Sequence, residues 1–150
     1  MSVTTREQIY GALFALSANL TWGAQKSFAY RSRRVKTFSD VPEWPALCQA
    51  EHDEQVVART NMPAIRTFGA VWLVYHNVGK DASAIPASES NAILDQLDTL
   101  FPSDPSDPRY PQQTLGGLVH RCAIQGRIIK EHGDIDGQAL LIVPIRIFAP

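Results

Sequence analysis

The feature that most limits the fold of this 150-residue chain is the stretch of residues 114–148. It contains two apolar runs, Leu118–Ile129 and Gln138–Phe148, separated by the polar segment Lys130–Gly137. Two runs rich in β-branched and aliphatic residues around a short loop with Asp and Gly predict a β-hairpin. The second run is apolar on both of its alternating faces, which is typical of a strand covered on both sides or by a partner chain. Because Pro144 lacks an N–H group, we expect an edge or a bulge near it.

Apolar residues at helical spacing predict two helices, one of them over Thr5–Leu16. Thr4 or Thr5 would cap the first helix, and Ser88 or Ser90 would cap the second. The stripes expected to face the core contain Ile9, Leu13, Leu16 and Leu20 in the first helix, and Ile93, Leu94, Leu97, Leu100 and Phe101 in the second.

Four strands are predicted between the helices, with a polar turn among them. Glu51–Glu54 are expected to form that hairpin turn rather than a metal site, because alternate side chains on a strand diverge and cannot all reach one ion. His76, at the end of the last of these strands, is expected to be a hydrogen-bonded group at the surface. The four strands are expected at residues 27–38, 46–50, 56–60 and 65–78.

The expected element order is therefore α-β-β-β-β-α-β-β, over a single domain of residues 1–150. Strands that follow each other through short turns should pair antiparallel. The fold class predicted from this order is α+β, in which two helices pack on a mostly antiparallel sheet.

Composition excludes several classes of protein. An apolar content of 45% and a charged content of 19% are typical of an ordered globular domain, and a net charge of −1 argues against a chain that coats nucleic acid. No apolar run approaches the roughly 18 residues that span a bilayer, and the polar N-terminus predicts no secretion. Cys48 and Cys122 are expected to be free, buried thiols.

The basic residues of the chain cluster in one place, at Arg31, Arg33, Arg34 and Lys36. One interpretation is a solvated edge strand that charge protects against unwanted pairing. A second is a surface that contacts an acidic protein partner, and a third is a patch that contacts phosphates of DNA.

Motifs that carry chemistry are absent from the sequence: it contains no P-loop, GxSxG, CxxC or HExxH pattern. His120 and Cys122 lie two residues apart on an expected strand, so a Cys–His pair is geometrically possible, but the apolar neighbours of Cys122 favour a packed core. Asp134 and Asp136 resemble the start of a calcium loop that lacks its later ligands. We therefore expect no catalytic, cofactor-binding or metal-binding residues.

Four stretches nevertheless suggest a family. They are the opening Arg6–Tyr10 with Leu13 and Phe14, SRRVKTFSDVPEWPALCQ at 32–49, QTLGGLVHRCAIQGRI at 113–128 and QALLIVPIRIF at 138–148. With the order of elements, these stretches resemble the tail terminator, or tail completion, proteins of long-tailed phages with lambda-like tails.

This resemblance implies the lambda-like tail terminator fold and a structural role without catalysis or cofactors. Such proteins form a ring, commonly hexameric, that caps the tail tube, ends its polymerisation and presents its other face to head-completion or neck proteins. The protein would be assembled in the host cytoplasm and lie in the virion, at the head-proximal end of the tail, and DNA would pass through the ring without specific binding. We expect Arg31, Arg33, Arg34 and Lys36 to form part of a subunit or tube contact. Three alternatives stay open, namely another head–tail joining or neck protein, a small enzyme that uses Cys122 and His120, and a small nucleic-acid-binding module.

Overall fold

The computed structural model describes residues 4–23, 25–77, 83, 85–102, 106, 108, 112–133 and 136–149. Within them the chain forms two α-helices and one sheet of six strands, so the α+β class with a mostly antiparallel sheet is confirmed. The helices are α1 (Arg6–Leu16) and α2 (Pro86–Leu100), and the strands are β1 (Tyr30–Ser32), β2 (Ala46–Arg59), β3 (Met62–Asn77), β4 (Arg121–Ile124), β5 (Ile129–Glu131) and β6 (Gln138–Phe148). Short 3-10 turns lie at Ser17–Asn19 and Phe38–Asp40.

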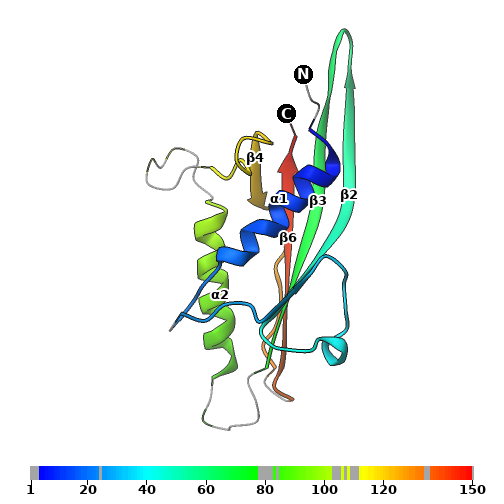
Figure 1. Ribbon diagram of the computed structural model, residues 1–150. Helices are drawn as coiled ribbons and strands as arrows, with labels where there is room; N and C mark the ends of the chain where they lie inside the picture. Colours follow the sequence, from blue (N-terminus) through cyan, green and yellow to red (C-terminus); the bar gives the residue numbers. More distant parts are fainter. Residues whose placement is uncertain are drawn as a thin grey trace.

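The strands follow the order β1-β2-β3-β6-β4, and β5 also pairs with β6. Figure 1 shows β2, β3, β6 and β4 side by side in this order. Every pairing is antiparallel except that of β1 with β2, which is parallel. The expectation of antiparallel neighbours does not hold there because residues 33–45 form a long connection, and a long connection can return the chain for parallel pairing. The sheet is therefore mixed.

The prediction of a hairpin turn at Glu51–Glu54 is wrong, because these residues lie within the single strand β2. Its register against β3 shifts between Glu51 and Glu54, which marks a β-bulge. The chain reverses later, at Thr60 and Asn61, where Asn61 has a φ of 59°. Asparagine tolerates this left-handed conformation, whereas the acidic residues stay extended. The element order is accordingly α-β-β-β-α-β-β-β.

The C-terminal hairpin is confirmed, but its first strand is divided. The predicted run Leu118–Ile129 contains β4 and only the first residue of β5, and a break at which Gly126 has a φ of 123° separates the two strands. The break faces Pro144, whose carbonyl accepts a hydrogen bond from Gln125 N at 3.2 Å. A Cβ on Gly126 would lie 3.2 Å from the Pro144 ring, so glycine permits the close approach. The irregularity expected near Pro144 is therefore confirmed.

Helix α1 begins with a capping box, in which the Thr5 side chain accepts from Gln8 N and the Gln8 side chain accepts from Thr5 N. Three buried polar contacts fix this helix on the sheet. Gln49 Nε2 donates to Tyr10 O at 3.0 Å, Trp72 Nε1 donates to Gln49 Oε1 at 2.9 Å, and the Tyr10 hydroxyl donates to a β3 carbonyl. Burial raises the pKa of Tyr10 to about 12, so this hydroxyl stays a donor.

Helix α2 begins at Pro86, so capping by Ser88 or Ser90 is wrong. The missing N–H of proline costs nothing in the first turn of a helix. Ser90 is buried instead, and its Oγ lies 2.9 Å from Nε2 of His76. The expectation for His76 is half right: the side chain is hydrogen-bonded, but it is only 2% exposed and lies in the interior.

Both helices cover one face of the sheet, and Figure 1 shows α1 crossing β3 and β6. The main core lies in this layer and includes Leu13 from α1, Ile93 and Leu97 from α2, and Trp72, Val143 and Ile147 from the sheet. Cys48 and Cys122 are free and buried, as predicted. On the second face a smaller cluster around Val41, Cys48 and Tyr75 covers one end of the sheet.

The rest of the second face, the open face, carries a half-buried apolar row. Val71 lies opposite Pro144 and Leu73 lies opposite Ile142, so these side chains share that face. The row extends to Phe148 at the end of β6. Contacts among the described residues thus explain the two-sided apolar pattern of β6 only in part.

Candidate functional site: a protruding arm and the cleft at its base

The most prominent feature of the fold is a hairpin that continues past the rest of the sheet (Figure 1). β1 pairs with β2 only as far as Cys48, and β6 pairs with β3 only as far as Thr67. Beyond these points β2 and β3 pair only with each other among the described residues. We call this two-stranded extension, residues 55–66, the arm.

The arm exposes large apolar side chains on both of its faces. Val56 is 48% exposed, Val57 46%, Met62 58% and Ile65 47%. Val57 lies opposite Ile65, and Val56, which lies opposite Arg66, points to the other face. A two-stranded hairpin has little stability of its own in water, and exposed apolar clusters mark contact surfaces.

The free edge of the arm on β2 lacks the usual protection. Residues 55–58 contain neither charge nor proline, the two features with which edge strands commonly avoid pairing. The opposite edge is protected, since Pro63 lies there and Arg66 O accepts from Ala149 N at 3.1 Å. The arm is therefore suited to contact another chain.

Glu54 anchors the base of the arm on the helix-covered side. Its Oε1 lies 2.6 Å from Nε of Arg6, and its Oε2 lies 3.1 Å from Nη1 of Arg66. A second bond from Arg6 Nη2 at 2.7 Å makes the contact to α1 bidentate. The hydrogen bond from Arg6 is the main reason why the pKa of Glu54 lies below its ordinary value.

Asp53 anchors the base on the other side, where its Oδ1 lies 3.0 Å from Nη1 of Arg146. The pKa of Asp53 is lowered, first by the hydrogen bond with His52 and then by that with Arg146. Gly69 makes room for this pair, because a Cβ at that position would lie 2.1 Å from Asp53 Oδ1. The acidic residues expected to form a turn thus connect the arm to α1 and β6.

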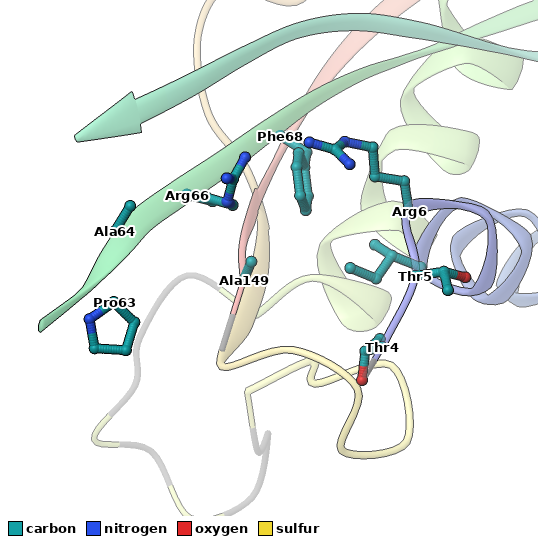
Figure 2. A pocket seen from close by; sticks show the side chains of 9 residues that line it. Thr4, Thr5, Arg6, Pro63, Ala64, Arg66, Phe68 and Ala149 are labelled. Atoms are coloured by element: carbon teal, nitrogen blue, oxygen red, sulfur yellow. The ribbon is translucent and has the colours of Figure 1, made fainter. Parts of the chain in front are cut away.

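A cleft of about 630 Å³ lies beside the base of the arm (Figure 2). One wall is the start of α1, where the Arg6 guanidinium lies 5.9 Å from the ring centroid of Phe68. The other wall is the arm itself, and the end of β6 contributes Ala149. The lining consists of Thr4, Thr5, Arg6, Ile9, Pro63, Ala64, Arg66, Phe68 and Ala149.

Two members of the predicted basic cluster bind other residues of the same chain. Arg31 Nη1 donates to Phe14 O at 3.2 Å and to Ser17 Oγ at 2.9 Å, and its guanidinium lies over the Phe14 ring. Arg33 forms ion pairs with Glu7 and Glu51. Arg31 in β1 therefore binds α1, and Arg33, just after β1, binds α1 and β2.

The other two members face a different environment. Lys36 Nζ lies 5.6 Å from the Tyr30 ring centroid, and Lys36 O accepts from the Tyr75 hydroxyl at 2.7 Å. Arg34 is exposed. Together with Val35, Thr37 and Asp40, these two residues line a shallow depression of about 510 Å³. The sequence cluster is thus divided between internal contacts and a smaller basic surface.

The chemical alternatives gain no support from the geometry. Cys122 is buried, and burial raises the pKa of its thiol to about 12, so it stays protonated and is not a nucleophile at neutral pH. His120 is exposed. Among the described residues, no group of three or more His, Cys, Asp or Glu side chains is arranged to hold a metal ion. The Asp134 of the calcium-like pattern lies outside the described residues.

The arm is the part of the candidate site that the sequence did not predict. The adjacent Val56 and Val57 were a usable signal, since two neighbouring valines on a strand point to opposite faces and cannot both enter one core. Within the described residues, no helix is long and apolar enough to cross a membrane. No protein-family model matches the chain, and no curated protein matches it.

Proposed function

We propose that this chain is a structural phage protein with the lambda-like tail terminator fold, and that it assembles into a hexameric ring. The observation that carries the proposal is the arm, a two-stranded hairpin on which Val56, Val57, Met62 and Ile65 are exposed and which no other described residue covers on these side chains. Such a surface is stable in water when another chain covers it.

Copies of the same chain are the partner that a ring requires. A closed ring needs two different patches on each subunit, so that each subunit contacts one neighbour with the first patch and the other neighbour with the second. The arm supplies one protruding patch. The cleft at its base and the half-buried row of the open face supply further surfaces.

The ring caps the tail tube at its head-proximal end and stops the addition of tail tube protein. Its other face binds the head-completion or neck protein, and DNA passes through the ring. A role based on shape needs no activated nucleophile. Burial raises the pKa of the Cys122 thiol to about 12, so this thiol stays protonated at neutral pH. The resemblance of residues 32–49, 113–128 and 138–148 to tail terminator proteins supports the same role.

The test compares arm variants with a matched surface variant. Val57 and Ile65 lie opposite each other on the arm, so the double variant V57D/I65D places charge in the expected contact without touching the core. The control is I85D, because Ile85 is 71% exposed and lies outside both the arm and the basic cluster.

We expect the wild-type chain and I85D to form closed rings on the ends of tail tubes, seen by electron microscopy, and V57D/I65D to remain monomeric in sedimentation. Tubes grown with V57D/I65D should be longer than those capped by the wild-type chain. Wild-type chains that leave tube ends bare and tube growth unchanged would contradict the proposal.

A further inference from the structure

We propose that the shallow depression at Arg34 and Lys36 binds the acidic stripe of α2, formed by Asp95 and Asp98, on a neighbouring copy of this chain. The inference rests on the proposed function for one premise, which is that copies of the chain associate into a ring. It adds a second contact to that ring, besides the arm, and it names the charged residues that meet there.

The shallow depression keeps a positive charge that the described part of the chain does not balance. Two cations, Arg34 and Lys36, line it against the one carboxylate of Asp40, which leaves a net charge of +1. This carboxylate is already bound, because Thr37 Oγ1 donates to Asp40 Oδ2 at 2.9 Å. The ion pairs of the described residues include neither Arg34 nor Lys36. The depression is therefore complementary to a surface that carries several carboxylates.

The acidic stripe lies on the exposed side of α2. Asp95 and Asp98 are three residues apart, so their Cβ atoms lie roughly 5–6 Å from each other on the same side of the helix. Both side chains are exposed, whereas Ile93 and Leu97 are buried in the core. No ion pair of the described residues includes either aspartate. The stripe therefore presents two negative charges to a partner.

The pKa of Asp98 distinguishes this stripe from other acidic side chains. Partial burial raises the pKa of Asp98, and the charge of Asp95 raises it further. The pKa values of Glu7 and Glu54 are lowered instead, first of all by a hydrogen bond from an arginine. Asp95 and Asp98 thus repel each other without a compensating cation from the described residues. A cation from a partner would remove this cost.

The two surfaces lie on different sides of the subunit, as a ring requires. Residues 33–45 follow β1, the first strand in the order of the sheet, and they cover one end of the second face through Val41. Helix α2 packs on the other face. Figure 1 accordingly shows α2 and residues 33–45 on opposite sides of the sheet. Two different patches that cannot meet within one subunit form a head-to-tail contact, the kind from which rings are built.

The charges decide which patches meet, and the apolar arm supplies buried area. Exposed pairs of opposite charge add little affinity, because water and salt screen them. Equal charges placed opposite each other at an interface weaken association much more strongly. Charge reversal is therefore the sharpest test of this contact.

The first experiment reverses the charge on one side of the contact at a time. R34E/K36E makes the depression acidic, and D95K/D98K makes the stripe basic. In either variant alone, patches of equal sign would meet, so we expect association in sedimentation to weaken at least about tenfold and tube ends to stay without rings. Because a tail without its ring stays unjoined, joined tails should become fewer as well.

An equal mixture of the two reversed variants should restore the ring. In the mixture, each acidic depression meets a basic stripe and each basic depression meets an acidic stripe, so the two chains alternate. Native mass spectrometry should find both chains in equal numbers in each ring. The matched control mixes R34E/K36E with the wild-type chain, and there the closed rings should contain wild-type chains only.

A neutral variant measures the contact without repulsion between subunits. D95N/D98N removes the repulsion within the stripe, so its melting temperature should equal or exceed that of the wild-type chain. Its association should nevertheless be weaker, because the attraction to Arg34 and Lys36 is lost. Increasing salt should weaken association of the wild-type chain more than that of D95N/D98N.

The outcomes separate this inference from the proposed function. Wild-type rings together with unimpaired rings of either reversed variant would overturn the contact and leave the ring intact. The contact would equally be overturned if the mixture of two folded variants formed no ring, or if D95N/D98N kept the association and the salt dependence of the wild-type chain. A wild-type chain that forms no ring on tube ends or in solution would overturn both.

Discussion

At the scale of single residues, His76 shows how burial changes the meaning of a polar side chain. At the end of an apolar strand it predicts a surface group, yet α2 covers it and Ser90 is its hydrogen-bond partner. Nδ1 of His76 is buried without a partner among the described residues. The charged groups that act on it are Glu89, His132 and Lys26.

Burial lowers the pKa of His76 below its ordinary value of 6.5, and this makes stability depend on pH. The unfolded chain binds a proton at this site below pH 6.5, whereas the folded chain resists it. We therefore expect the free energy of unfolding to fall as pH decreases from 7 towards 5, by no more than about 1.4 kcal/mol per pH unit from this residue. Urea unfolding at several pH values measures the slope, and His76→Gln should reduce it. An equal slope in the variant would exclude His76 as the cause.

At the scale of elements, β2 differs most from its expected form. The sequence Glu51–Glu54 is polar enough for a turn, and a turn is what local composition predicts. It is instead part of a bulged strand that pairs with β3, and each of its carboxylates lies beside arginines from other segments, namely Arg33, Arg146, Arg6 and Arg66. Those partners lie up to 93 residues away in the chain, so no local window contains the information.

Loss of the Glu54 ion pairs should loosen the arm, but it should hardly change the free energy of unfolding of the chain. Exposed pairs contribute about 0–1 kcal/mol, because water and salt screen them. We expect Glu54→Gln to increase amide hydrogen exchange in residues 55–66 and to leave the protected amides of β6 unchanged. High salt should have the same effect on the wild-type chain.

Glu43→Gln is the matched control, since Glu43 is exposed and lies outside the arm. Exchange in the arm that is equal in Glu54→Gln, Glu43→Gln and the wild type would mean that the Glu54 ion pairs do not restrain it.

At the scale of the whole molecule, the basic cluster is divided between two environments, contacts within the chain and the lining of a shallow surface depression. Arg33 forms ion pairs with Glu7 and Glu51, so Arg33→Glu would place a third carboxylate beside these two. Arg34 and Lys36 line the shallow depression and are the members available to a partner.

We therefore expect Arg34→Glu/Lys36→Glu to impair joining of the ring to the tail while the melting temperature stays within a few degrees of the wild type. Arg33→Glu should instead lower stability, by about 1 kcal/mol, through repulsion at the surface. Thermal unfolding and counting of joined tails by electron microscopy distinguish the two. Full assembly of the Arg34/Lys36 variant would remove these residues from the contact.

Local patterns in the sequence were enough to predict several parts of this protein. The apolar stripes of α1 and α2, the alternation along β3 and β6 and the α+β class follow from periodicities of a few residues. The free buried thiols follow from the number and the separation of the two cysteines. The irregularity at Pro144 also follows from one residue, because proline has no N–H to donate.

Where residues distant in sequence meet could be seen only in the folded chain. It extended β2 through Glu51–Glu54, divided the basic cluster between α1 and the surface, buried His76 under α2, and placed the cleft between α1, the arm and β6. In each case, interactions between segments far apart in the chain override a weak local preference.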